Sequence, residues 1–166
     1  MIYTKNKTLK IYLACSFAYE DKRLTNERKE MMSKIETYLS SKDFRDKFDL
    51  NEVEVYNPST FKVENAWDYS YWDWGDLVYQ EDKKNLDDSD LVVFLSYGKE
   101  NNAGSVWEVG HACGKDIPVL LVSIKSGSPE SLMALHSAYS CIDGYEGLLN
   151  YDFKTMPRTR IERIES

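Results

Sequence analysis

The sequence predicts an α/β fold with a parallel sheet at its core. Short apolar runs recur along the chain, longer amphipathic patterns separate them, and neither an internal repeat nor a low-complexity stretch breaks the alternation. This order is typical of parallel strands joined by helices, because a crossover between parallel strands is itself usually a helix. With 166 residues, 42% of them hydrophobic, the chain has the size and composition of one folded unit. We therefore expect a single domain over residues 1–166.

Five apolar segments are expected to form the strands: residues 9–15, 53–56, 91–95, 118–124 and 140–142. The third and fourth are apolar almost throughout, as expected of central strands that are buried on both faces. The second is short and stops at Asn57-Pro58. The last is a candidate edge strand.

Helical patterns occupy the intervals between these strands. We expect helices over residues 21–40, 76–87 and 105–114, and a short helix over residues 130–136. In the first, Met31, Ile35, Tyr38 and Leu39 are spaced to share one face. A loop is expected over residues 126–129.

Composition argues against several classes of function. The chain has 28 acidic and 21 basic residues, a net charge of −7, and no basic stripe, so nucleic acid is not an expected partner. Three cysteines without a CxxC pair favour a reducing, cytoplasmic location. They and the two histidines offer no zinc-binding pattern, so no metal is expected.

Other motifs are missing as well. The longest apolar run, residues 118–122, is far too short to span a bilayer, and the first ten residues lack the apolar region of a signal peptide. We therefore expect no membrane partner. The sequence contains neither GxGxxG nor GxxxxGK[ST], which counts against dinucleotide-binding and P-loop enzymes.

The candidate site lies at the carboxyl ends of the strands, where open α/β sheets bind ligands. Residues 102–112, which follow the third strand, contain the clearest functional candidate. Gly104 is expected to permit a tight turn and Ser105 to cap a helix, which places Glu108 at about the third helical position. Spacing alone leaves two interpretations open: Ser105 and Glu108 form a capping box, or Glu108 is catalytic. Val106, Val109 and Cys113 are expected to pack on the sheet.

A second carboxylate, Asp82, lies near the end of the helix expected over residues 76–87 and could reach the same cleft as Glu108. Two such carboxylates suit glycosyl transfer, in which one attacks the anomeric carbon and the other manages protons or hydroxyls. A single Glu108-x-x-His111 pair does not make a di-iron site. Five aromatic residues within 67–74 fit a core or subunit contact, or a platform that stacks a planar ligand.

Several segments together resemble the nucleoside 2-deoxyribosyltransferase family. The similar segments keep the family's order and are residues 10–17, 82–93, 102–112, 114–115, 118–122, 131–133 and 150–158. The most specific is Gly104-Ser105-x-x-Glu108-x-Gly110-x-Ala112. The resemblance implies a flavodoxin-like (Rossmann-like) three-layer sandwich with a central parallel sheet of about five strands.

The resemblance also implies an activity in nucleoside salvage. The family moves a 2-deoxyribosyl group between nucleobases without a cofactor, so the implied partners are nucleosides, free bases and other copies of the chain that share active sites. Glu108 would be the nucleophile that holds a covalent deoxyribosyl intermediate. Tyr12 would orient Glu108, and Asp82 would help to hold the sugar. Phe17 would cover the base, and Gly104 belongs to the matching binding segment.

Some residues depart from the family pattern. Asn102 stands where the family usually has an Asp that hydrogen-bonds or protonates the leaving base, and an amide cannot supply that proton. Glu100 and Asp82 are alternative proton sources. Ser131 replaces a more usual Asn that reaches into the neighbouring subunit's site to bind the sugar 5′-hydroxyl.

Two other functions stay open at this point. A related enzyme would hydrolyse the N-glycosidic bond of nucleosides or nucleoside 5′-monophosphates, and Lys125 with residues 126–128 could then contact a phosphate. A non-catalytic nucleotide-binding module could keep the same fold. Retention of Tyr12, Asp82 and Glu108 favours an enzyme.

Overall fold

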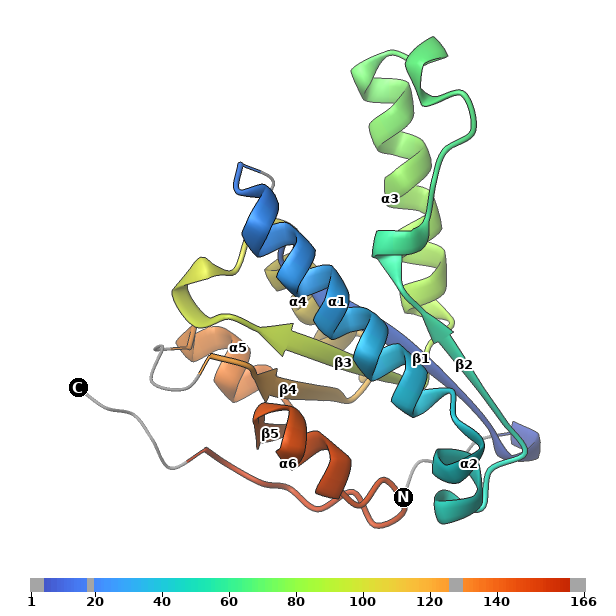
Figure 1. Ribbon diagram of the computed structural model, residues 1–166, viewed down its shortest axis with the longest axis vertical. Coiled ribbons are helices and arrows are strands. Elements are labelled where there is room, and N and C mark those ends of the chain that lie inside the picture. Colours follow the sequence, from blue (N-terminus) through green and yellow to red (C-terminus); the bar gives the residue numbers. More distant parts are fainter. Residues whose placement is uncertain (1–4, 18–19, 126–129, 162–166) are drawn as a thin grey trace.

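The core of the chain is a five-stranded parallel sheet (Figure 1). A computed structural model describes residues 5–17, 20–125 and 130–161. The strands are β1 (Thr8–Cys15), β2 (Glu52–Tyr56), β3 (Leu91–Ser96), β4 (Val119–Ser123) and β5 (Ser140–Asp143). Their order in the sheet is β2-β1-β3-β4-β5, with every neighbouring pair parallel. This is the flavodoxin-like order, which reverses between β1 and β3 and confirms the predicted fold.

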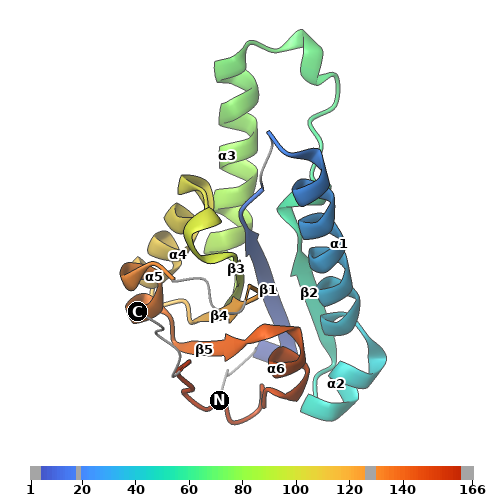
Figure 2. The ribbon, with the colours of Figure 1, turned by 60° about the vertical axis from the view of Figure 1, so that its left-hand side comes forward.

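Helices cover both faces of the sheet. Those described are α1 (Lys22–Leu39), α2 (Lys42–Phe48), α3 (Tyr71–Asp87), α4 (Ala103–Gly114), α5 (Leu132–Ser137) and α6 (Gly144–Asn150). Short 3₁₀ turns occupy η1 (Lys5–Lys7), η2 (Pro58–Thr60), η3 (Ala66–Asp68) and η4 (Gly98–Glu100). Figure 2 shows α1, α2 and α6 on one face and α3, α4 and α5 on the other, which makes three layers.

Each face of the sheet has its own buried cluster, because successive side chains of a strand point to opposite faces. On β1, Ile11 and Leu13 join the cluster beneath α1, α2 and α6. Tyr12 and Ala14 join the cluster beneath α3, α4 and α5. The side chain of Tyr12 therefore points toward the helices that carry the predicted carboxylates.

The first predicted helix is confirmed. Asp21 is the N-cap of α1, and its carboxylate accepts hydrogen bonds from the backbone N–H groups of Arg23 and Leu24. Ile35 and Leu39 are buried as expected. Arg28 is also buried, although helical periodicity gave no reason to expect an arginine on the inner face.

Helix α3 begins five residues before the predicted start, at Tyr71 instead of residue 76. The Ser70 hydroxyl caps it by accepting from the Asp73 N–H. Figure 1 shows the first turns of α3 extending beyond the sheet. Trp67 and Trp72 are 99% and 83% exposed, so the interpretation of this aromatic segment as core is wrong.

Two helices and the packing of the C-terminal tail against β5 were not predicted. Helices α2 and α6 lie in segments for which no element was predicted. The tail covers β5, because the Cys141 N–H donates to the Thr159 carbonyl over 3.0 Å. The loop expected over residues 126–129 lies outside the described residues. In the described part of the chain, no helix is both long enough and apolar enough to cross a membrane.

Candidate active site

The candidate site lies beside β1 and β3, where the strand order reverses. The Tyr12 hydroxyl, on β1, donates a hydrogen bond of 2.7 Å to Oε1 of Glu108, on α4. These residues are 96 positions apart in the chain, and the sheet brings them together. The contact lies at the kind of switch point where α/β folds place their ligands.

The start of α4 differs from the prediction and changes the role open to Glu108. Asn102 is the N-cap, and its Oδ1 accepts a 3.1 Å hydrogen bond from the Ser105 N–H. Ser105 is the third helical residue and Glu108 the sixth, so the capping-box interpretation is wrong. Gly104 lies inside the helix instead of at a tight turn; the glycine with positive φ in this region is Gly98, at 63°.

The inner face of α4 is also rotated from the expected one. Its buried residues are Ser105, Val109 and Ala112, whereas Cys113 is exposed. Glu108 precedes Val109 and flanks this face, which directs its carboxylate toward β1.

Burial controls the protonation of Glu108. Removal of the carboxylate from water raises its pKa to about 8, and the nearby charge of Asp82 acts in the same direction. The Tyr12 hydroxyl lowers the pKa because it donates to the charged form. Burial and the neighbouring Glu108 raise the pKa of Tyr12, so this phenol keeps its proton and remains a donor. The side chain of Glu108 therefore changes between its neutral and ionised forms close to neutral pH.

Asp82 reaches the site through a tyrosine that sequence reasoning missed. The Tyr56 hydroxyl donates a 2.8 Å hydrogen bond to Oδ1 of Asp82. The Tyr56 ring lies 5.4 Å from the Tyr12 ring, centroid to centroid. Burial raises the pKa of Asp82. The position of Tyr56 at the carboxyl end of a predicted strand was the available signal.

Asn102 joins the loop after β1 to the start of α4. Its backbone N–H donates to Ser16 Oγ over 2.8 Å, and its Nδ2 donates to the Phe17 carbonyl over 3.3 Å. The hydroxyls of Ser16 and Ser105 share a short hydrogen bond. Phe17 is partly buried against the α1 side of the core, and the Lys29 ammonium lies 5.9 Å from its ring. Phe17 and Asn102 are thus neighbours in the segments that precede α1 and α4.

Two acidic residues fix the loops after β3 and β4. Glu100 forms ion pairs with Arg28 and Lys125, which lower its pKa and make it a poor proton donor. Glu130 accepts from the hydroxyls of Ser96 and Ser123, at the carboxyl ends of β3 and β4. These contacts place Ser131, the N-cap of α5, next to an anchored residue.

Other polar residues near the site have structural partners. His111 Nε2 lies 2.6 Å from Oδ1 of Asp87, so His111 pairs with α3 and not with Glu108. Asp90 accepts from the Lys10 N–H over 2.8 Å. Within residues 5–17, 20–125 and 130–161, no three His, Cys, Asp or Glu side chains are grouped to bind a metal ion.

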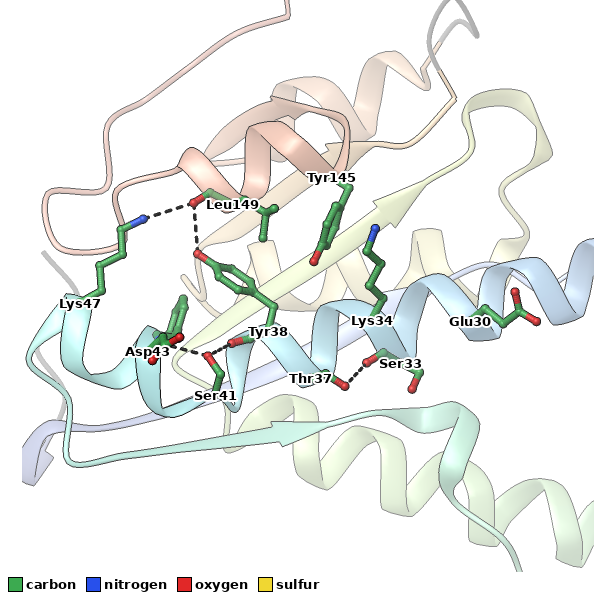
Figure 3. Close-up of a pocket in the computed structure, with 11 residues that line it drawn as sticks. Glu30, Ser33, Lys34, Thr37, Tyr38, Ser41, Asp43, Lys47, Tyr145 and Leu149 are labelled. Carbon is green, nitrogen blue, oxygen red and sulfur yellow. Dashed lines mark hydrogen bonds between the residues drawn. The ribbon is translucent and has the colours of Figure 1, made fainter.

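A separate groove of about 700 Å³ lies on the other face of the sheet, between α1, α2 and α6 (Figure 3). Tyr38 and Lys47 bond to the Leu149 carbonyl at one end, and the Lys34 ammonium lies 3.9 Å from the Tyr145 ring centroid. None of the residues that line it is a predicted site residue. The groove and the candidate active site are therefore distinct.

Comparisons with known proteins agree with this fold. The chain is similar in structure to a 2-deoxyribosyltransferase from Bacillus psychrosaccharolyticus, with a TM-score of 0.68, 24% identity, and coverage of 91% of this chain and 98% of that one. A conserved protein from Enterococcus faecalis V583 matches with a TM-score of 0.52, 18% identity, and coverage of 94% and 92%. Among curated proteins, none matches the sequence.

The family comparison covers the segments that build the site. The sequence model described as nucleoside 2-deoxyribosyltransferase matches residues 11–133, well over half of the 166 residues. This range includes Tyr12 on β1, Asp82 on α3 and Glu108 on α4. At these low identities, structural similarity establishes only the fold. The match to the sequence model establishes the family. The chain belongs to the nucleoside 2-deoxyribosyltransferases, a family of pentosyl-transferring enzymes.

Proposed function

We propose that the protein transfers a 2-deoxyribosyl group from one nucleobase to another by double displacement at Glu108. The observation that carries this proposal is the hydrogen bond from the buried Tyr12 hydroxyl to Glu108. It occupies one carboxylate oxygen, holds the side chain in one orientation and leaves the second oxygen for attack. A capping role no longer competes for this residue, because Asn102 caps α4.

The proposed reaction has two balanced steps. In the first, Oε2 of Glu108 forms a bond to C1′ of the nucleoside while the N-glycosidic bond breaks, and its electron pair leaves with the base. In the second, a ring nitrogen of the acceptor base attacks C1′ and the bond to Oε2 breaks, and the proton that this nitrogen loses balances the one that the departed base takes up. Two inversions retain the configuration of the sugar, and Glu108 returns as a carboxylate.

Departure of the base is helped by hydrogen bonding or protonation. The Asn102 amide can donate to the base but cannot deliver a proton. Ion pairs lower the pKa of Glu100, which makes it a poor proton source, so in this proposal the Asn102 hydrogen bond assists the leaving base. Asp82 is ionised when its charge raises the pKa of Glu108, so its proposed role is to help hold the sugar. Its hydrogen bond with Tyr56 keeps the carboxyl group beside Tyr12 and Glu108.

The substrates proposed are free deoxynucleosides and nucleobases in the cytoplasm, without a cofactor. Phe17 and Gly104 would border the base, and Ser131 would bind the sugar 5′-hydroxyl in the site of a second copy of the chain. Support comes from the family and from the hydrogen bond that joins the Asn102 side chain to the Phe17 carbonyl.

The test is incubation with a deoxynucleoside in the presence and absence of a second free base, followed by product separation. We expect a new nucleoside only when the acceptor is present. Glu108→Ala should lower the rate by at least about 10³-fold, because no other group can form the covalent intermediate. Release of base at the same rate without acceptor would instead identify an N-glycoside hydrolase, and no turnover would identify a binding module.

A further inference from the structure

Arg28 is a buried arginine that joins two loops of the candidate site. It lies on α1 and its side chain is 2% exposed. Nη1 donates to the Ser16 carbonyl over 2.7 Å, and Nη2 donates to Oε2 of Glu100 over 2.8 Å. The guanidinium also lies 4.3 Å above the centroid of the Tyr97 ring. One side chain therefore contacts the segment after β1 and the segment after β3.

A buried guanidinium needs such partners, because removing it from water is costly unless its charge and its donors are matched. The planar fork of arginine can reach two acceptors and stack on a ring at once, which lysine cannot do. Glu100 extends the arrangement, since its other oxygen accepts from Lys125, two residues after β4. Arg28, Glu100 and Lys125 together form a charged clasp across three loops.

The clasp is connected through Ser16 to the elements that carry Tyr12 and Glu108. Ser16, whose carbonyl Arg28 holds, accepts from the Asn102 N–H through its hydroxyl and bonds to the Ser105 hydroxyl. Those contacts set the start of α4 against the end of β1. The same two elements carry Glu108 and Tyr12, and the same loops carry Phe17 and Asn102.

We propose that Arg28 is a positioning residue for substrate binding: through Ser16 and Glu100 it holds Phe17 and Asn102, the proposed binding rim for the base, in register. This inference rests on the proposed function. Arg28 does not touch Glu108, so its loss should misplace the binding rim more than the nucleophile. The expected signature is a rise in KM that exceeds the fall in kcat.

The test compares Arg28→Met with Arg23→Met, steady-state kinetics being measured on the folded protein. Arg23 lies on the same helix, and its side chain is 72% exposed and pairs with Glu27, so it is a matched control. We expect Arg28→Met to raise the KM for the deoxynucleoside about tenfold or more, and Arg23→Met to leave it unchanged. Arg28→Lys should give an intermediate KM.

A purely structural role would give a different result. Partial unfolding lowers the active fraction and hence the apparent kcat, but it does not raise KM. Should Arg28→Met fail to fold, Glu100→Ala removes the carboxylate partner and leaves the arginine; we expect it to raise KM about threefold or more. An unchanged KM in a folded Arg28→Met, or in Glu100→Ala where Arg28→Met does not fold, would overturn the proposal.

Hydrogen exchange separates this inference from the proposed function. The Asn102 and Ser105 amides bond to Ser16 Oγ and Asn102 Oδ1, and both should exchange faster in Arg28→Met than in Arg23→Met. If the wild-type protein turns over no nucleoside, the proposed function fails while this comparison still tests the clasp. Equal exchange rates of these two amides in both variants would overturn the inference about Arg28.

Discussion

At the scale of single residues, the pKa of Glu108 governs the expected pH dependence. Only the ionised carboxylate attacks, and burial raises its pKa to about 8. We therefore expect kcat/KM to increase as the pH rises through about 8, since this ratio reports ionisations of the free enzyme. A rate that is constant from pH 6 to 9 would contradict this assignment.

Tyr12→Phe tests the partner of that carboxylate. The hydroxyl lowers the pKa of Glu108 by donating to its charged form, so its removal should move the midpoint of the pH profile upward. We expect the rate at pH 7 to fall by about tenfold, as one charge-assisted hydrogen bond is lost. Tyr38→Phe is the matched control, because its hydroxyl bonds to the Leu149 carbonyl in the distant groove. A midpoint that does not move in Tyr12→Phe would separate Tyr12 from the titration of Glu108.

Asn102→Asp tests the most conspicuous departure from the family. The aspartate can keep the cap on the Ser105 N–H, and the helix N-terminus favours its ionised form. It would accept hydrogen bonds from an amino group on the base but could no longer donate. We expect the ratio of kcat/KM for adenine or cytosine over hypoxanthine or uracil to rise about tenfold, measured with mixed acceptors. An unchanged ratio would place Asn102 outside the base site.

At the scale of elements, the central strands β3 and β4 were predicted well because burial on both faces leaves apolar runs that polar residues do not interrupt. The helix starts were predicted less well. For α4, both Asn102 and Ser105 are good capping residues. Asn102 is the cap, and the Ser105 hydroxyl bonds to Ser16 across the site instead. For α3, Ser70-x-x-Asp73 marks the start of the helix, whereas the neighbouring aromatic residues favoured a core that Trp67 and Trp72 do not join.

The site itself was predictable only in part. Glu108 and Asp82 were candidates from the local sequence, whereas Tyr12 came from the family resemblance, because no spacing rule relates a strand to a helix 96 residues later. Tyr56 and Arg28 were not predicted for a common reason. Each is a polar residue on a strand or helix whose hydrophobic pattern gives it no special position. Their roles depend on partners that only the sheet order brings near, Asp82 for Tyr56 and Glu100 for Arg28.

At the scale of the whole molecule, the raised pKa of Glu108 couples the site to the stability of the fold. The pKa is about 8 in the folded protein, against 4.5 for an ordinary glutamate. Between these values the folded state binds more protons than the unfolded state, so this group makes the free energy of unfolding fall as the pH rises from about 4.5 to 8. Asp87, whose partners His111 and Lys83 lower its pKa to about 2, acts below this window.

Glu108→Gln should remove this dependence, because the amide stays neutral and its carbonyl can still accept from Tyr12. We expect the variant to be more stable than the wild type above pH 8, by on the order of 5 kcal/mol, and the difference to disappear below about pH 4.5. Urea denaturation of both proteins at pH 5 and pH 8.5 measures it without any substrate. A difference that is the same at both pH values would mean that Glu108 ionises in the folded protein as it does in the unfolded chain. The carboxyl group of Glu108 would then have an ordinary pKa and would not cost the fold any stability. A stability difference confined to high pH instead means that the folded protein loses stability because it keeps a desolvated nucleophile.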